Sequence, residues 1–339
     1  MPSTINAIPD ITSGQLRKKG AADANLTLQT NGINAVTIDN SQNANFVSTG
    51  ATTIPHGTTA QRPASPVNGM IRYNTDYSLI EGYISGAWKA ITGTYPYTAT
   101  YFIAAGGGGA NFGGGGAGGY LANSTSFTGG TVYTITVGAG GAGSTYPSNG
   151  GNGGDSSIIA TGLSLTATGG GGAGGTGAGQ NGGSGGGASI GTQSGGTGIS
   201  GQGFAGGSST AAAFNAGGGG GGASAIGTNA VSQTQGGNGG NGIATSISGS
   251  SVTYCGGGSG CSTNGGGGGS NGTGGGGTVN TGGGGGGNGV TLNSGGSGRV
   301  ILSVPTASYS GAYTGSNTVV TTSGANTIIT FNASGTYTA

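Results

Sequence analysis

The sequence predicts an all-β or irregular fold, in which a short β-stalk and a β-meander precede a large glycine-rich domain framed by β-strands. Three observations lead to this prediction. Glycine supplies 92 of the 339 residues, far above the usual share of about 7%, and most glycines lie between Ile103 and Gly298. In that interval Asp155 is the only Asp, Glu, Lys, Arg or His. Strand-like runs, YFIAA and RVILSV, stand at its two ends.

The charges and the apolar runs exclude several classes of protein. The formal net charge is +1, with seven Lys and Arg and six Asp and Glu. These residues form no basic stripe, so we expect no nucleic-acid binding. No run of about 20 apolar residues occurs, so we expect no membrane insertion. The opening MPSTINAIPDITSGQLRKKG also lacks the apolar core of a secretory signal.

The N-terminal part divides into an arm and a stalk. Residues 1–20 are polar and end in basic residues, and we expect them to be an attachment arm. Residues 21–51 carry the runs LTLQT, AVTIDN and ANFVST between turn signals, and their alternation of apolar and polar residues predicts half-buried strands. The stretch has too little apolar mass for a domain of its own. We therefore expect these strands to bury their faces against copies of the same chain.

Residues 52–94 are expected to form a three-stranded meander. The runs GMIRYNTD, SLIEGYI and GAWKAI predict the strands, and Asn74–Asp76 and Ser85–Gly86 predict the turns. Aromatic side chains within such strands favour core packing over sugar binding. The expected packing residues are Tyr73, Tyr83 and Trp88.

Residues 95–304 form the glycine-rich domain. A flexible Gly/Ser linker is the alternative, but VYTITV, RVILSV and recurring apolar residues between them argue for a folded segment. Ordering glycine costs more conformational entropy than ordering other residues, and glycine buries little area in return. Polyproline-II-type helices of glycine make no internal hydrogen bonds and can bond laterally when no side chains separate them. We expect a bundle of such helices, with glycine inside and Ala, Ser, Thr and Asn on its surface and loops.

Residues 305–339 are expected to be a C-terminal β-segment. The closing FNASGTYTA is similar to TGTYPYTATYF, which leads into the glycine region. This similarity predicts the terminal strand of an abbreviated second unit.

Two cysteines, Cys255 and Cys261, are separated by GGGSG. They are too few for a disulfide framework, and no His accompanies them as a metal ligand. They could close a small disulfide loop in an oxidising compartment or remain reduced. A structural pair is favoured over a redox role, because reactivity needs an activating environment.

No catalytic constellation is visible, and we expect no enzymatic activity, cofactor or metal. His56 is the single histidine, and no base and orienting acid can be assigned to a nucleophile. No phosphate-binding G-x-x-x-x-G-K-[ST] occurs. Asp76 and Glu81 flank a predicted hairpin, where solvent-exposed charges are favoured over a glycosidase pair.

Three stretches of the sequence carry a resemblance to a known family. YFIAAGGGG, TITVGAGGAG and GGSGRVIL resemble the glycine-rich domain near the tips of many bacteriophage tail fibres. GTTAQRPASPVNGMIRYNTD and EGYISGAWKAI resemble a short module of tail-fibre and virion appendage proteins. LTLQTNGINAVTIDNSQNANFVSTG is similar to the repetitive β-stalk of such fibres.

The resemblance implies a homotrimeric fibre of the virion. Its N-terminal region would join other tail, baseplate or virion proteins, and its distal domain would bind a bacterial surface glycan or outer-membrane protein. The glycine-rich part is also similar to the polyglycine-helix adhesins of some T-even-like phages, in which loops between glycine helices bind the receptor. This chain departs from them by carrying its own stalk and meander. A weaker similarity to the glycine-rich domain of animal receptor tyrosine kinases, such as anaplastic lymphoma kinase, is opposed by the lack of a signal peptide and of a cysteine framework.

The expected function is host recognition and adsorption through non-covalent receptor binding by the glycine-rich domain. The expected contacts lie largely in insertions between glycine runs, STYPSN, SSTAAAFN and TNAVSQTQ, since aromatic side chains dominate binding hot spots. Each could equally pack on the side of the bundle. The alternative is a purely structural virion fibre or capsid decoration protein, and an ice-binding protein is a distant third. The candidate receptor-binding residues are Thr145, Tyr146, Phe204, Phe214, Asn215, Asn229 and Gln233.

Overall fold

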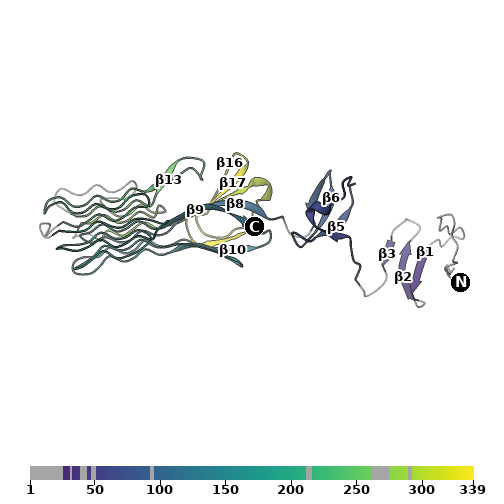
Figure 1. Ribbon diagram of the computed structural model, residues 1–339, viewed down its shortest axis with the longest axis horizontal. Coiled ribbons are helices and arrows are strands. Elements are labelled where there is room, and N and C mark those ends of the chain that lie inside the picture. Colours follow the sequence, from purple (N-terminus) through teal and green to yellow (C-terminus); the bar gives the residue numbers. More distant parts are fainter. Residues whose placement is uncertain are drawn as a thin grey trace. The chain divides into compact units, whose positions relative to one another are not determined.

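A computed structural model of the chain describes residues 26–30, 33–38, 44–46, 51–91, 95–210, 216–261, 275–288 and 292–339. The chain forms two compact units, Met1–Thr92 and Gly93–Ala339 (Figure 1). Among the described residues the regular elements are nearly all β-strands, arranged in several sheets. Within these residues no helix has the length and apolar character that crossing a membrane requires.

The first unit begins with the predicted stalk strands. They form a three-stranded antiparallel sheet in the order β1-β2-β3. A register shift between Leu28 and Gln29 interrupts the β1–β2 ladder. The strands are β1 (Leu26–Thr30), β2 (Ile33–Ile38) and β3 (Ala44–Phe46). The predicted attachment arm, residues 1–20, lies outside the described residues.

The second sheet of this unit contains the predicted meander. Its order is β4-β5-β6-β7, with β5, β6 and β7 antiparallel and an additional short β4 parallel to β5. Ser85 and Gly86 both have positive φ, 52° and 78°, as a two-residue hairpin requires. The elements are β4 (His56–Gly57), the 3-10 turn η1 (Thr59–Gln61), β5 (Ile71–Asn74), β6 (Leu79–Ile84) and β7 (Ala87–Ala90).

Glu81 corrects the sequence prediction, because it is fully buried rather than exposed. Arg72 lies directly opposite it in the β5–β6 ladder, so both side chains share one face of the sheet. Arg62 completes the cluster, with Nε donating to Glu81 Oε1 at 3.0 Å. Asn74 Nδ2 donates to Glu81 Oε2, also at 3.0 Å. Asp76 is exposed, as predicted.

The predicted aromatic packing is also partly wrong. Tyr73 is 36% exposed, because it lies on the opposite face of β5 from Arg72. Tyr83 and Trp88 are half-buried and meet edge to face, with ring centroids 5.5 Å apart. The guanidinium carbons of Arg62 and Arg72 lie 5.6 and 6.0 Å from the centroid of Trp88. The centre of this sheet is therefore an ion cluster stacked on one indole.

The second unit contains two antiparallel sheets that pack face to face. One has the order β16-β17-β15-β8-β9, and the other has the order β12-β11-β10-β18. The strands of the first are β8 (Tyr97–Ala104), β9 (Tyr120–Phe127), β15 (Arg299–Pro305), β16 (Val319–Ser323) and β17 (Asn326–Phe331). Those of the second are β10 (Val132–Thr136), β11 (Ser156–Ala160), β12 (Leu163–Ala167) and β18 (Gly335–Thr338). A 3-10 turn, η2 (Thr306–Ser308), follows β15.

The two sheets bury the main hydrophobic core between them. Alternate residues of β8, from Tyr97 to Ile103, point into it. Tyr97 and Tyr337 join the two sheets through their hydroxyls, 2.9 Å apart, and burial raises the pKa of Tyr97 well above its usual value. On the other face of β8, Phe102 packs on Tyr254 of a small hairpin, with centroids 4.8 Å apart. That hairpin consists of β13 (Ile243–Thr245) and β14 (Val252–Tyr254).

The strands that frame the glycine region are neighbours in the sheet. Val300 of β15 lies opposite Ile103 of β8, so the run RVILSV closes the domain beside YFIAA, as its position predicted. The C-terminal residues add β16 and β17 to the same sheet and β18 to the opposite one. Residues 305–339 thus complete this sandwich, and their last strand does not begin a second unit.

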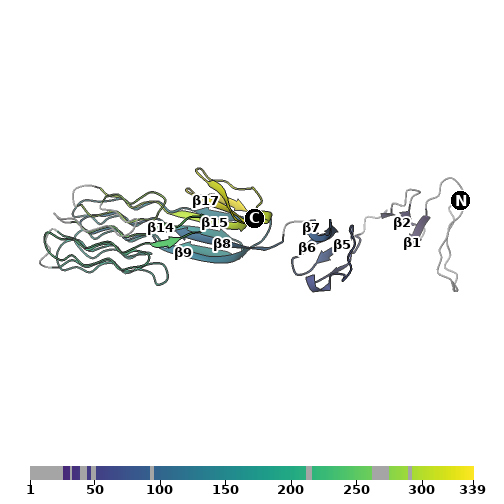
Figure 2. The same ribbon diagram turned by 90° about the horizontal axis from the view of Figure 1, so that it is seen from above.

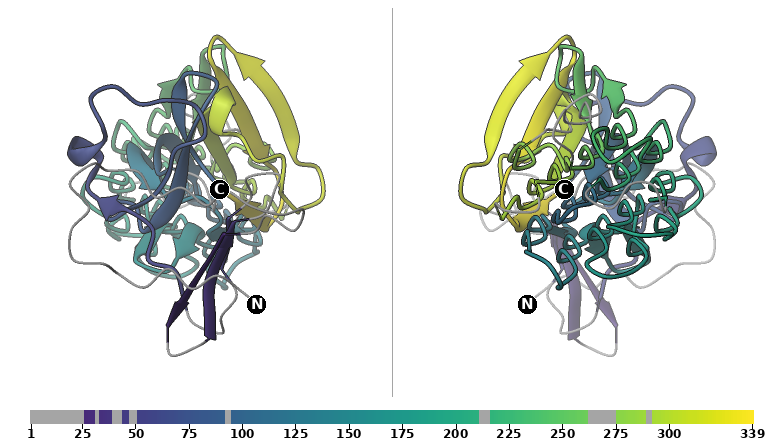
Figure 3. Two further views of the ribbon diagram at one scale, coloured as in Figure 1. Left: turned by 90° about the vertical axis from the view of Figure 1, so that its right-hand side faces the viewer. Right: turned by 90° about the vertical axis from the view of Figure 1, so that its left-hand side faces the viewer.

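The glycine-rich chain leaves the sandwich at the strand ends and runs out and back many times (Figures 1 and 2). Seen end-on, these stretches appear as coils lying side by side (Figure 3). We call them glycine segments. Their principal members are residues 105–110, 113–119, 137–143, 150–155, 168–174, 184–188, 204–209, 216–222, 225–230, 236–242, 255–261, 282–288 and 292–298.

Hydrogen bonds between glycine segments repeat every three residues. The N–H groups of Ala105 and Gly108 donate to one neighbouring segment, 113–119. Those of residues 106 and 109 donate to segment 150–155, and those of residues 107 and 110 donate to segment 292–298. In segment 216–222 the N–H groups likewise reach three different neighbours in turn, at 2.8–3.2 Å from donor to acceptor. Each such segment is therefore bonded to neighbours on three sides.

Close approach of these segments explains the glycine content. A Cβ on Gly220 would lie 1.9 Å from the carbonyl oxygen of Gly115, and one on Gly106 would lie 2.0 Å from that of Ala139. The obstructing atoms are backbone atoms, which cannot rotate away as a side chain can. Glycine is not universal inside, however. Ala117, Ala173 and Ser184 are buried, which corrects the expectation that these types lie on the surface and in loops.

The central glycines are expected to be irreplaceable on steric grounds. Gly220→Ala should destabilise the second unit by about 3 kcal/mol or more, since overpacking costs 1–3 kcal/mol even where neighbours can adjust. Gly177→Ala is the matched control, because no atom lies within 4 Å of its added Cβ. It should change the free energy of unfolding by less than about 1 kcal/mol. Denaturant unfolding of both variants measures the difference, and equal effects would contradict the steric explanation.

The ion cluster of the first unit gives a second prediction. Glu81→Gln should destabilise this unit by about 3–5 kcal/mol, because it leaves two guanidinium groups without their carboxylate. Asp76→Asn, the same change at an exposed acid, should have an effect below about 1 kcal/mol. Trp88 is the only tryptophan of the chain, so its fluorescence during denaturation follows this unit. A stable Glu81→Gln variant would show that the cluster contributes little.

Candidate functional site

The glycine segments are joined by turns at the end away from the sandwich. These turns present exposed side chains. The hydrogen-bond register places this end, since each outgoing segment returns beside itself after such a turn. We call these the far-end turns. Their described residues are 111–112, 144–149, 175–178, 189–194 and 231–235.

Two far-end turns lock together around Asn111. Its Nδ2 donates to the carbonyl of Ser148 at 2.5 Å and to Ser144 Oγ at 3.2 Å. The Phe112 and Tyr146 rings meet edge to face, with centroids 6.3 Å apart and an interplanar angle of 82°. Asn111 is buried, Phe112 is half-buried and Tyr146 is 51% exposed. This aromatic pair is thus anchored at its base and open at one side.

Leu292 is 64% exposed and lies at the same end of the glycine segments. Its backbone touches the end of segment 137–143, since a Cβ on Gly143 would lie 2.6 Å from the Leu292 carbonyl carbon. The N–H of Ala110 bonds to the next residue, Asn293. The half-buried Phe112 and the exposed Tyr146 form a small aromatic patch, which we call the far-end patch.

A side-chain ladder holds the segment that follows Tyr146. Asn149, Asn152 and Asp155 recur at three-residue spacing in NGGNGGD. Their side-chain oxygens accept the N–H groups of residues 175, 172 and 169, at 2.7–2.8 Å. Asp155 therefore has a structural role as an acceptor. The ladder fixes one side of the turn that carries Tyr146.

The candidate residues from the sequence do not all gather at this end. Thr145 and Tyr146 lie in the far-end patch and its turn, and Gln233 is exposed in the separate far-end turn 231–235. Phe204 is 44% exposed, but it follows the turn 199–203 at the opposite end of the segments. Asn229 is exposed, and its Oδ1 accepts the N–H of Ser208, at 2.8 Å, within the bundle. The remaining candidates, Phe214 and Asn215, lie outside the described residues.

Sequence reasoning missed Phe112 of the far-end patch and the exposed Leu292 at the same end of the segments. Phe112 interrupts AGGGGANFGGGG, and an aromatic inside a glycine run could have indicated an outward turn. Leu292 stands in GVTLNSGG and carried no comparable signal. Its place at this end depends on a pairing between segments distant in the sequence.

The far-end patch carries no charged side chain, because Asp155 is the only Asp, Glu, Lys, Arg or His between residues 103 and 298. A ligand there would meet aromatic faces, hydroxyls, amides and backbone groups. Binding of that kind depends little on screening by salt.

The cysteines provide no alternative chemistry. Both are free thiols in the structure rather than a disulfide pair. Burial raises the pKa of Cys255 to about 12 and also raises the pKa of Cys261. Both shifts disfavour the thiolate, which is the reactive form. No group of three potential metal ligands among His, Cys, Asp and Glu occurs in the described part of the chain.

Comparison with known proteins identifies the glycine-rich part. A family model described as a glycine-rich domain matches residues 85–305, more than half of the chain. No curated protein matches, and no solved structure matches.

Proposed function

The chain belongs to the glycine-rich domain family, and we propose that it is a virion fibre protein of the bacteriophage tail-fibre type. Its glycine-rich domain would bind a bacterial surface glycan or outer-membrane protein without covalent chemistry. The observation that carries this proposal is the far-end patch, an aromatic surface held by a hydrogen-bonded scaffold. The stalk and meander sequences, which resemble tail-fibre modules, support the same proposal.

The glycine segments are, in this proposal, left-handed polyproline-II-type helices. Such a helix has three residues per turn and no internal hydrogen bonds. The three-residue period of donors and the three sets of partners around segment 216–222 agree with that geometry. A bundle of this kind needs no large side chains, which leaves its turns to carry recognition. Rigid presentation lowers the entropic cost of binding.

The fibre is proposed to be a homotrimer, and the first unit provides the support. Among the side chains described in this unit, Leu79 is the only apolar one that is buried. The face of the β5–β7 sheet opposite the ion cluster instead exposes Ile71, Tyr73 and Ile84, at 52%, 36% and 45%. Units of this size often need oligomerisation for stability. Packing three copies through this face would bury it.

Ile84→Asp tests the trimer. The charge should weaken association and shift the chain toward monomer in sedimentation velocity at micromolar concentration. Val67→Asp is the control, since Val67 is 61% exposed but lies outside the sheet; it should leave the assembly unchanged. A chain that is monomeric without substitution would overturn this part of the proposal.

A polar glycan fits the far-end patch by its chemistry. Sugar rings present C–H faces that stack on aromatic rings, and their hydroxyls pair with amides and hydroxyls of the kind that surround Tyr146. Neither partner needs charge, which agrees with the absence of Asp, Glu, Lys, Arg and His from the far-end turns. An outer-membrane protein loop would use the same aromatic pair as an anchor.

The second candidate is a purely structural appendage. The dense backbone hydrogen bonding of the glycine segments favours it, because a stiff rod needs only such bonding. It gives no role to an exposed aromatic pair, and this difference separates the two candidates experimentally.

Tyr146→Ala is the decisive variant. It should weaken binding of the labelled protein to host bacteria about 30-fold, as for a hot-spot aromatic worth about 2 kcal/mol. Phe204→Ala provides a matched control, because this aromatic is similarly exposed at the opposite end of the bundle. It should bind like the unsubstituted protein. If neither the variants nor the unsubstituted protein bind to any susceptible strain, the result would favour the structural appendage.

A further inference from the structure

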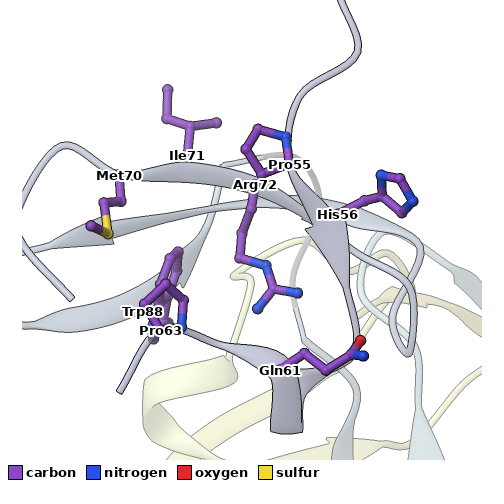
Figure 4. Close-up of a pocket in the computed structure, with 8 residues that line it drawn as sticks. All are labelled: Pro55, His56, Gln61, Pro63, Met70, Ile71, Arg72 and Trp88. Carbon is purple, nitrogen blue, oxygen red and sulfur yellow. The ribbon is translucent and has the colours of Figure 1, made fainter. Parts of the chain in front are cut away.

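The first unit contains a pocket that the proposed function does not use. Its volume is about 320 Å³, and its lining combines apolar residues with a guanidinium (Figure 4). The apolar part includes Pro63, Met70 and Trp88, and the polar part includes Gln61 and Arg72. In Figure 4 the Arg72 side chain extends from the strand into the space between Trp88 and Gln61.

Arg72 has hydrogen-bonding capacity that its surroundings leave unused. The residue is only 5% exposed. Its Nη2 donates to the carbonyl of Thr58 at 3.0 Å, and its Nε lies 3.7 Å from Glu81 Oε1. Its Nη1 is buried and has no hydrogen-bond partner. An unsatisfied buried donor on a charged group is costly, so it indicates an acceptor that is missing from the structure.

The charge of the surroundings indicates the sign of that acceptor. Glu81 is the carboxylate of both ion pairs in the described part of this unit, with Arg62 and with Arg72. Two guanidinium groups thus share one carboxylate beside the pocket, and a second anion would balance them. A planar carboxylate matches the fork geometry of a guanidinium better than a spherical ion does.

The backbone fits closely around the other side of this guanidinium. A Cβ on Gly57 would lie 2.9 Å from Arg72 Nη2 and 2.7 Å from Gln61 Oε1. The φ of Gly57, +157°, is also in a range that glycine favours. Gln61 is held in turn, because its Oε1 accepts the N–H of Thr58 at 2.9 Å.

We propose that this pocket binds an organic carboxylate, with the carboxylate on Arg72 Nη1 and an apolar body against Trp88, Pro63 and Met70. The ligand is a small molecule of this class or the C-terminal carboxylate of a peptide, which offers the same chemistry. The site is independent of receptor binding at the far-end patch.

Fluorescence of Trp88, the only tryptophan, provides a direct readout with the full chain. Benzoate should change it saturably, and at least tenfold more tightly than benzamide, which has nearly the same shape without the charge. This comparison needs no substitution. Equal binding of the two probes, or no response to either, would overturn the proposal, and a water molecule would then be the simplest partner for Nη1.

Variants locate the effect. Arg72→Met should reduce benzoate affinity at least tenfold, whereas Lys89→Met removes an exposed positive charge of the same unit and should leave it unchanged. A folded Arg72→Met variant with unaltered benzoate affinity would also overturn the proposal.

A short peptide ending in phenylalanine, with a free or an amidated C-terminus, distinguishes the two sources of the carboxylate. Tighter binding of the free-acid peptide than of benzoate would identify a protein C-terminus as the ligand, and weaker binding would identify a small acid.

Discussion

Direct contact between bare backbones is the constraint on which the second unit depends. A carbonyl oxygen of one glycine segment occupies the place where a Cβ of its neighbour would stand, as Gly115 does for Gly220. The same proximity lets N–H groups reach three neighbours in turn. Stability then comes from many satisfied hydrogen bonds and close contacts, each of modest net value. Such an assembly has little tolerance for side chains in its interior and ample tolerance at its turns.

The sandwich makes this arrangement possible. Its strands have ordinary apolar side chains, and their pairing fixes where each glycine segment starts and ends, as β8 and β15 do for the first and last segments. Without such anchors, ordering so many glycines would have a high entropic cost. In the C-terminal strand β18, Tyr337 pairs with Tyr133 of β10, and its hydroxyl contacts that of Tyr97 in the opposite sheet. The last residues of the chain therefore join the two sheets that support the glycine segments.

Local patterns in the sequence predicted the strands well: VYTITV alternates, with Tyr133 and Ile135 buried, and RVILSV is a continuous apolar run whose Val300, Ile301 and Leu302 are all buried. The glycine content predicted close backbone packing, because a residue without a Cβ lets neighbouring backbones touch. Side-chain partners were less predictable. Glu81 is charged and flanks a turn, yet it is buried because Arg62 reaches it from a distant loop. Phe112 meets Tyr146 only because two separate glycine segments end side by side. Phe204 and Tyr146 look alike in the sequence but lie at opposite ends of the segments.

The ladder of Asn149, Asn152 and Asp155 has a consequence for how the molecule ends. A segment with a free row of N–H groups could accept another segment, from this chain or from a different molecule, much as an open sheet edge accepts a strand. Here the donors of Gly169, Gly172 and Gly175 are taken by side chains instead. A side-chain acceptor satisfies a backbone N–H group without adding a row of backbone groups to which a further segment could bond. On that side the polar ladder therefore leaves no free row of N–H groups with which another segment could pair.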